Sequence, residues 1–284
     1  MIGPDRLARV TAAAVVPEQV VAYVAAVAGS RPRMIADCVG YASDGNLVLI
    51  GYPLDDPRDA SAMSTAVAEA LNLPGLERIT VIGPARPPQA PQTAAAVQDT
   101  YYALPVPAPA PGQKLRNLLH RAARELSLVQ GRCLENDHAV LVQRYLDERP
   151  LAPGTRHIFS QLSWYIKASA SSRVVSGRLA DGRLAAFAVG EFAPLSTAFF
   201  MFCFRDPGLA PPGSADLVLA GLLEEARQHG QTRMNLGLGV NPGIGFFKRK
   251  WGAEPFLPYV EVSWEVKPRG LISKLRRLWA TGEP

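Results

Sequence analysis

The first part of the chain alternates apolar runs with turn-forming residues, a pattern typical of α/β structure. Apolar runs at residues 34–41 and 47–51 flank the Ser-Asp-Gly-Asn turn signal at 43–46, which predicts a β-hairpin. We expect a helix at 60–71 and a strand at 79–82 that ends in a Gly-Pro pair. An apolar run at 20–29 is too short to span a membrane and predicts a short buried helix.

The same order of elements returns further along the chain. We expect strands at 174–179, 184–192 and 197–204, a helix at about 215–229 and a strand at 233–238. Gly230 follows the helix at its C′ position, and a glycine-containing turn follows the last strand. Because hairpin, helix, strand and glycine turn occur twice in the same order, the sequence predicts two related α/β halves.

Prolines mark the joint between these halves. Eight of them lie in residues 84–112, a density that neither a central strand nor a helix start tolerates. We therefore expect an N-terminal half at 1–112, ending in an extended Pro-rich crossing segment with one strand around 100–104, and a C-terminal half at 113–284. In the C-terminal half, further helices are expected at 113–130, 137–149 and 246–251, followed by a last strand at 259–266.

Composition excludes several classes of protein. With 48% hydrophobic and 19% charged residues, the chain is too apolar for a disordered protein and too charged for a polytopic membrane protein. Three cysteines without a CxxC pair and four histidines without a partner at ligand spacing indicate neither a disulfide framework nor a metal site. We expect a cytoplasmic protein, at most peripheral on the inner membrane face. The net charge of +5 permits a polyanionic partner without requiring one.

Residues 234–252 are the most informative stretch for chemistry. A strand there ends in Gly237 and Gly239, a loop carries Asn241, and a short helix carries Phe247 and Lys248. Glycines let a backbone approach a ligand and present its N–H groups, and a helix N-terminus favours an anion or a developing oxyanion. The alternative is a tight strand-to-helix turn with a solvated basic face.

This stretch also carries a family resemblance. The Asn-Leu-Gly strand at 235–237 and the segment from Gly245 through Phe247-Lys248 to Gly252 form a combined signature, and Lys-Leu-Arg-Asn at 114–117 adds a basic helix start. In these features residues 113–260 resemble the tandem GNAT-fold proteins, namely the Fem-type aminoacyltransferases and the C-terminal domain of phosphatidylglycerol lysyltransferase. The resemblance implies an α/β (α+β) fold with two tandem GNAT-like halves, each a mixed sheet flanked by helices.

The resemblance also implies a reaction. An acceptor amine or hydroxyl would attack an activated ester or thioester directly, with no cofactor and no covalent enzyme intermediate. Three prolines in the loop at 205–215 remove N–H donors where a coenzyme A pyrophosphate would bind, which favours aminoacyl-tRNA over acyl-CoA as the donor. The alternatives are an acyltransferase dependent on acyl-CoA or acyl-carrier protein, and a degenerate GNAT-fold binding module. The acceptor can be a small molecule, a peptide or a lipid.

Three residues are candidates for catalysis. Glu191, at the end of an apolar strand, is either a general base or a residue emerging at the rim. Asp206 either orients an amine or forms a turn. Asn235 lies in a central strand, where its amide must bond to neighbouring backbone or to a ligand.

The candidates for substrate binding come from three parts of the chain. Lys248 is either a phosphate or carboxylate ligand or a surface lysine, and Trp164 is either an acceptor-pocket wall or core. The basic helix that follows Gly112 has either a solvated face or an anion site. The full set is Lys114, Arg116, Asn117, Trp164, Gly237, Gly239, Asn241, Phe247 and Lys248.

The C-terminal tail at 270–280 has the pattern of a basic amphipathic helix. Its apolar positions are Leu271, Ile272, Leu275, Leu278 and Trp279, and its basic positions are Lys274, Arg276 and Arg277. Such a helix contacts an anionic membrane or RNA, or packs on its own domain.

Overall fold

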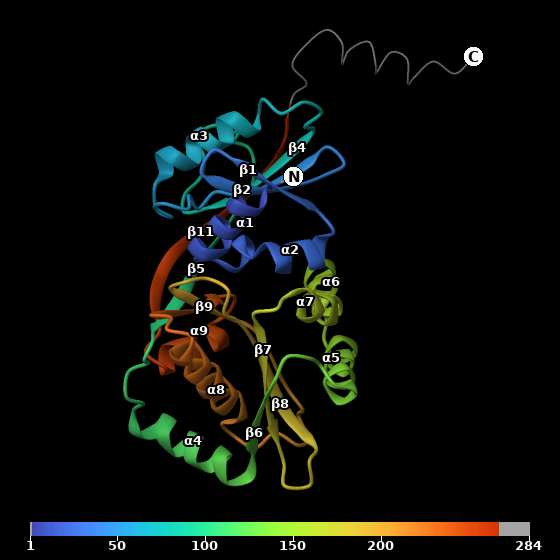
Figure 1. Ribbon diagram of the computed structural model, residues 1–284, viewed down its shortest axis with the longest axis vertical. Helices are drawn as coiled ribbons and strands as arrows, with labels where there is room; N and C mark the ends of the chain where they lie inside the picture. The colour runs from blue at the N-terminus through green and yellow to red at the C-terminus, as the bar shows by residue number, and fades with distance from the viewer. Residues whose placement is uncertain (1, 267–284) are drawn as a thin grey trace, which may run out of the picture. The chain divides into compact units, whose positions relative to one another are not determined.

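The computed structural model describes residues 2–266, which form two compact units (Figure 1). Unit 1 contains residues 31–98 and 259–266, and unit 2 contains residues 2–30 and 99–258. This division differs from the predicted boundary at residue 112: the chain passes from unit 1 to unit 2 at residues 98–99, the N-terminal helices belong to unit 2, and residues 259–266 return to unit 1. Ala14 and Val20 of that segment are buried against Phe199 of unit 2. Residues 270–280, expected to be an amphipathic helix, lie outside the described residues.

Unit 1 has the strand order β1 (Arg31–Ile35), β2 (Cys38–Ser43), β3 (Asn46–Ile50), β4 (Arg78–Gly83) and the second part of β11 (Glu254–Glu265). Strands β3 and β4 are parallel, and the predicted helix between them is confirmed as α3 (Ala60–Ala70). The single strand predicted at 34–41 is wrong: Ala36, at φ +47°, and Asp37 turn the chain between β1 and β2. Because apolar residues lie on both sides of this turn, the sequence pattern does not reveal it.

Unit 2 has the strand order β5 (Ala96–Pro105), β10 (Arg233–Leu238), β9 (Thr197–Arg205), β8 (Leu184–Glu191), β7 (Ser172–Arg178) and β6 (Ser127–Gly131). Only β9 and β10 are parallel neighbours in this series. The strands predicted in this half are confirmed as β7 to β10. Every residue of β8 is buried, as expected for a strand covered on both faces.

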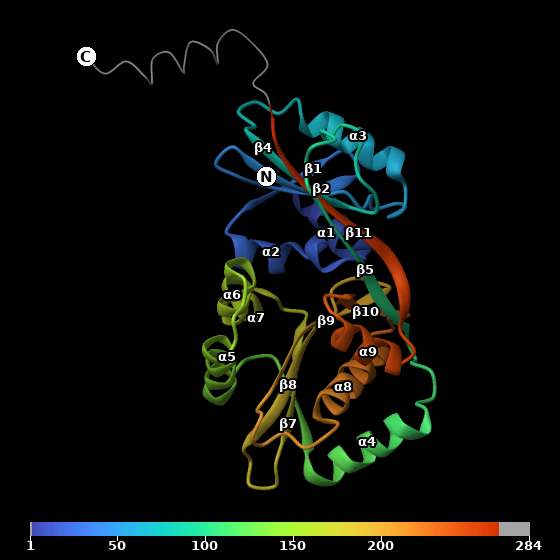
Figure 2. The same cartoon turned by 180° about the vertical axis from the view of Figure 1, so that it is seen from behind.

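Helices cover both faces of the unit 2 sheet (Figure 2). On one face, α8 (Ser214–Gln228) packs Val218 and Leu222 against Val175 and Ala188, and α4 (Gln113–Glu125) packs beside α8. The other face is covered by α5 (Asn136–Glu148), α6 (Pro153–Ser160) and α7 (Leu162–Ala168). The N-terminal segment of unit 2 contains α1 (Pro4–Ala13), η1 (Pro17–Gln19) and α2 (Val21–Ala28).

Two helix predictions need correction. The helix expected at 113–130 ends at Glu125, because Leu126 is already extended and residues 127–131 pair with β7 as strand β6. The helix expected at 246–251 starts earlier, as α9 (Pro242–Lys250), because the Asn241 side chain accepts a hydrogen bond from the Ile244 N–H as its N-cap. Within residues 2–266, no helix has both the length and the apolar character needed to cross a bilayer.

Gly213 offers a test of this packing. It has φ +92° at the start of α8, and a Cβ added there would lie 2.5 Å from the Leu118 backbone oxygen of α4. Gly213→Ala is expected to destabilise the fold by roughly 2 kcal/mol or more, since it adds a backbone clash to the cost of positive φ. Gly230→Ala, at φ +76° with open space around it, should cost only about 1 kcal/mol. Urea unfolding measures both, and equal losses would contradict the close approach of α4 and α8.

Candidate active site

Strands β9 and β10 separate partway along their length. They pair only through Thr197–Phe199 and Arg233–Asn235, after which β9 continues to Arg205 and β10 to Leu238 without pairing to each other. The register of β10 against β5 shifts after Asn235, and Gly237 has φ +78° within this bulge. A bulge bends the strand that carries it, so β10 turns away from β9 at this point.

A pocket of about 850 Å³ opens at this separation, entirely within unit 2. Its walls are the second half of β9, residues 236–238 of β10, the inner side of α9, the start of α8, one side of α5 and the N-terminal segment at Pro17–Tyr23. Phe247 of α9 stacks on Phe200 of β9 with ring centroids 6.4 Å apart. The pocket therefore combines an aromatic wall with backbone that is free of strand pairing on one side.

Lys248 places a cation at this wall. Its side chain is only 4% exposed, and its Nζ donates a hydrogen bond to the Leu238 backbone oxygen at the end of β10. Burial lowers the pKa of Lys248 to about 8, although the nearby charge of Asp99 acts in the opposite direction. Because this pKa lies near neutral pH, a modest rise above neutral pH deprotonates the Lys248 ammonium.

The turn between β10 and α9 is held by Asp99. Its carboxylate accepts hydrogen bonds from Gly239 N (3.0 Å) and Val240 N (2.9 Å). Val240 has φ +57°, a strained conformation for a β-branched residue. A Cβ added at Gly239 would lie 2.8 Å from Asp99 Oδ1, so only glycine fits there without a shift. These contacts fix the start of α9 and hence the position of Lys248.

Asn235 connects the bulge to the N-terminal segment. Its Nδ2 donates to Val15 O at 2.9 Å, and its Oδ1 accepts from Gly237 N at 2.7 Å. The side chain is fully buried and is not part of the pocket wall. Of the two partners expected for this amide, backbone or ligand, the structure shows backbone.

Solved structures with the same architecture identify the fold. FemX matches at 9% identity, with 98% of each chain covered and a TM-score of 0.64. L-PGS from Bacillus licheniformis matches at 13% identity over 99% of this chain and 98% of that one, with a TM-score of 0.58. A tandem GNAT protein from the clavulanic acid biosynthesis pathway matches at 14% identity over 94% and 97%, with a TM-score of 0.54.

The chain has the tandem GNAT fold. This confirms the fold predicted from the resemblance. No family model matches the sequence, and no curated protein matches it either.

All three predicted catalytic residues of this GNAT-fold chain lie outside the pocket wall: Asn235, described above, and also Glu191 and Asp206. Glu191 is fully buried and accepts hydrogen bonds from Tyr165 Oη (2.8 Å), Ser169 Oγ (2.6 Å) and two backbone N–H groups, those of Phe192 and Ala193. Burial, with the charge of Glu191, raises the pKa of Tyr165 well above its usual value. Glu191 therefore joins α7 to β8 and does not emerge at the rim.

Asp206 shapes the loop before α8. Its Oδ1 accepts from Gly208 N (2.8 Å) and Leu209 N (3.0 Å), and its Oδ2 accepts from Arg144 of α5 at 3.0 Å. This is the geometry of an Asx turn, the second of the two roles that the sequence allows. The carboxylate is thus occupied by its own loop and by α5.

The predicted substrate-binding residues divide into two groups. Gly237, Asn241, Phe247 and Lys248 line the pocket, and Gly239 lies beside them against Asp99. Lys114, Arg116 and Asn117 are exposed on α4, outside the pocket wall. Trp164 is 66% exposed on α7, with Lys167 Nζ 5.7 Å from its ring centroid, so it is neither core nor pocket wall.

Several pocket residues have no signal in the sequence. Arg144, Glu148 and Arg149 come from α5 and the residue after it, and Glu18 comes from the N-terminal segment, where the Tyr101 hydroxyl donates to its Oε2 at 2.8 Å. These residues are far from β9 and β10 along the chain, and only tertiary packing brings them to the pocket.

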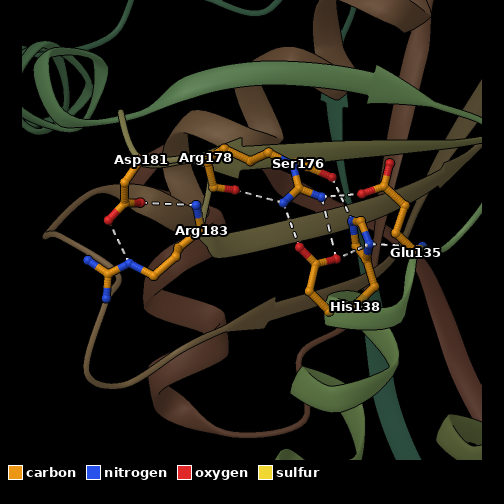
Figure 3. Close-up of polar contacts among 8 residues, drawn as sticks. Glu135, His138, Ser176, Arg178, Asp181 and Arg183 are labelled. Carbon is orange, nitrogen blue, oxygen red and sulfur yellow. Dashed lines mark hydrogen bonds and ion pairs between the residues drawn. The ribbon is translucent and has the colours of Figure 1, made fainter.

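A second polar cluster lies at the start of α5 (Figure 3). His138 accepts from Glu135 N at 3.1 Å through Nδ1, and its Nε2 lies 2.7 Å from Ser176 Oγ. Glu135, Asp137 and His138 have metal-ligand chemistry, but Arg178 donates to Asp137 at 2.5 Å and to Glu135 at 2.6 Å. The guanidinium of Arg178 therefore already pairs with both carboxylates, and desolvation lowers the pKa of His138. The cluster caps α5 and joins it to β7.

Asn235→Ala tests the connection to the N-terminal segment. The substitution leaves Val15 O and Gly237 N without their side-chain partner, so we expect a loss of about 2 kcal/mol in the free energy of unfolding. Trp164→Ala, a larger truncation at an exposed site, should change stability by less than about 0.5 kcal/mol. Chemical denaturation measures both values, and an Asn235→Ala protein as stable as Trp164→Ala would show that the amide contacts contribute nothing.

Proposed function

We propose that the protein transfers an aminoacyl group from aminoacyl-tRNA to an amine or hydroxyl acceptor bound in the pocket of unit 2. The separation of β9 from β10 beside Lys248 carries this proposal. Every second peptide group of an extended strand points toward a given neighbour. The N–H groups of β9 beyond Phe199 that point toward β10 therefore face the pocket, where they can donate to the carbonyl oxygen of the donor ester.

Charge develops on that oxygen during transfer. The lone pair of the acceptor nitrogen or oxygen attacks the ester carbonyl carbon, and the tetrahedral oxyanion forms beside the β9 N–H groups. The bond to the ribose oxygen then breaks, and the acceptor proton passes to that oxygen, which leaves a free 3′ end on the RNA. Fixed donors aimed at such an oxyanion are worth about 10²–10³ in rate. Lys248, when protonated, adds a positive charge to the same site.

A covalent enzyme intermediate is not needed for this reaction. Cys203 lines the pocket, but burial raises the pKa of its thiol to about 12, so little thiolate forms near neutral pH. Direct attack by the acceptor agrees with this chemistry.

The start of α8 favours an RNA donor over coenzyme A. Asp206 already accepts from two N–H groups of the preceding loop, and the N–H of Ser214 donates to Pro211 O at 3.1 Å. Asp216, in the first turn of α8, places a carboxylate, ion-paired with Lys250 at 2.7 Å, where a pyrophosphate would need donors. A coenzyme A pyrophosphate would therefore meet occupied N–H groups and a carboxylate.

Lys248 provides a pH test. The probe reaction is transfer from each aminoacyl-tRNA to hydroxylamine, measured as hydroxamate above the uncatalysed background. We expect Lys248→Met to lose about 10²-fold in rate. The wild-type rate should fall as pH rises through about 8, where the ammonium is discharged, whereas Lys248→Arg should not show this fall.

Lys167→Met is the matched control, since it removes an exposed lysine outside the pocket wall. It should react at the wild-type rate. Absence of hydroxamate from every aminoacyl-tRNA would contradict the proposed activity, and a Lys248→Met rate equal to that of the wild type would contradict the role of Lys248.

Coenzyme A binding separates the proposed donor from its main alternative. Because the N–H groups described at the start of α8 are already bonded, titration calorimetry with acetyl-CoA is expected to show a Kd weaker than about 1 mM, equivalent to less than about 4 kcal/mol of binding free energy. Micromolar binding would instead favour the acyl-CoA-dependent transferase.

A further inference from the structure

Helix α4 presents an exposed basic face that the proposed reaction does not use. Its apolar side, with Leu115 and Ala122, is buried in unit 2. The exposed side carries Asn117, His120 and four positively charged residues: Lys114, Arg116, Arg121 and Arg124. One of these, Arg121, forms an ion pair with Glu125 at 4.0 Å. An exposed pair of this kind is screened by water, so the face keeps a strongly positive character.

Helix α4 packs against the wall of the pocket. Gly213 lines the pocket, and the Cβ it lacks would lie 2.5 Å from Leu118 O of α4. Figures 1 and 2 both show α4 beside α8. A polymer that has its end in the pocket and leaves it past Gly213 therefore meets α4, whose exposed side is basic.

The chemistry of the face fits a sugar-phosphate backbone. Asn117, His120 and Arg124 line a shallow hollow on α4. Their amide, imidazole and guanidinium groups can form hydrogen bonds with phosphate and ribose. The 13 residues of α4 extend over about 20 Å, enough to meet several phosphates in succession.

The same face is poorly suited to a bilayer. A helix that lies in a membrane interface buries large apolar side chains in the lipid. The large apolar residues that are exposed in the described chain lie on other elements, among them Val140, Trp164 and Phe246. On α4 the exposed side chains are charged or polar, apart from Ala123.

We infer that the basic face of α4 binds the backbone of the RNA whose 3′ end enters the unit 2 pocket. This inference rests on the proposed function for the identity of that RNA. Neutralising phosphates releases counterions, so binding through this face depends steeply on salt.

The test uses the full chain and a fluorescent RNA hairpin with a single-stranded CCA 3′ end. Its Kd is measured between about 50 and 200 mM salt for the wild type and for the triple variant Lys114→Gln, Arg121→Gln, Arg124→Gln. We expect the variant to bind at least tenfold more weakly at the lowest salt. Its plot of log K against log salt should be shallower by about one for each phosphate that the variant no longer neutralises. The control variant, Arg31→Gln, Arg33→Gln, Arg58→Gln, removes the same charge from unit 1 and should bind as the wild type does.

The outcomes separate this inference from the proposed function. The assignment of α4 as the RNA-binding surface is contradicted if the control variant loses RNA binding as strongly as the α4 variant, or if neither variant loses it. This holds even where hydroxamate forms. If only the α4 variant loses RNA binding while no aminoacyl-tRNA supports transfer, the RNA-binding surface is supported and the proposed activity is contradicted. A last measurement uses vesicles of phosphatidylglycerol and phosphatidylcholine in equal parts. If the α4 variant loses vesicle binding but not RNA binding, the inference is overturned in favour of a membrane contact.

Discussion

The end of hydrogen bonding between β9 and β10 is the constraint on which the rest of unit 2 depends. Peptide groups that lose a strand partner inside a protein must find another, because an unpaired buried group costs about as much as a lost hydrogen bond. The chain meets this requirement with side chains: Lys248 donates to Leu238 O, and Asn235 accepts from Gly237 N. The remaining edge faces a pocket, where a ligand can complete it.

The N-terminal segment closes the same region from the other side. Gln19 accepts from Val15 N and Val16 N through one oxygen, which fixes the loop whose carbonyl group receives the Asn235 amide. Glu18 and Tyr23 of this segment then form part of the pocket wall. Residues 2–30 therefore belong to unit 2 although they precede unit 1 in the chain, and a unit cut at residue 113 would lack one wall of its pocket.

How far the sequence predicts this molecule depends on whether a feature is local. Strands β7 to β10 are apolar runs bounded by turn residues, so the sequence pattern alone is sufficient to predict them. Leu126 and Val129 continue the helical spacing of α4, yet pairing with β7 makes 127–131 a strand, and spacing alone does not reveal that competition. At the site, Phe247 and Lys248 are predictable because the strand, loop and helix are contiguous. The buried position of Glu191 is not predictable from the sequence, because its hydrogen-bond donor Tyr165 lies on a helix that the sequence pattern does not indicate.

The start of α8 is linked to the position of Lys248 through Asp216. Asp216 is buried there and accepts hydrogen bonds from Lys250 Nζ at 2.8 Å and Trp251 Nε1 at 2.9 Å, both at the end of α9. A carboxylate that is buried needs such partners, since an unpaired one is costly. The carboxylate in the first turn of α8 is therefore the group that anchors α9, the helix that carries Lys248. In this chain, removing Asp216 would therefore also release α9, so the carboxylate at the start of α8 and the placement of Lys248 are one structural arrangement.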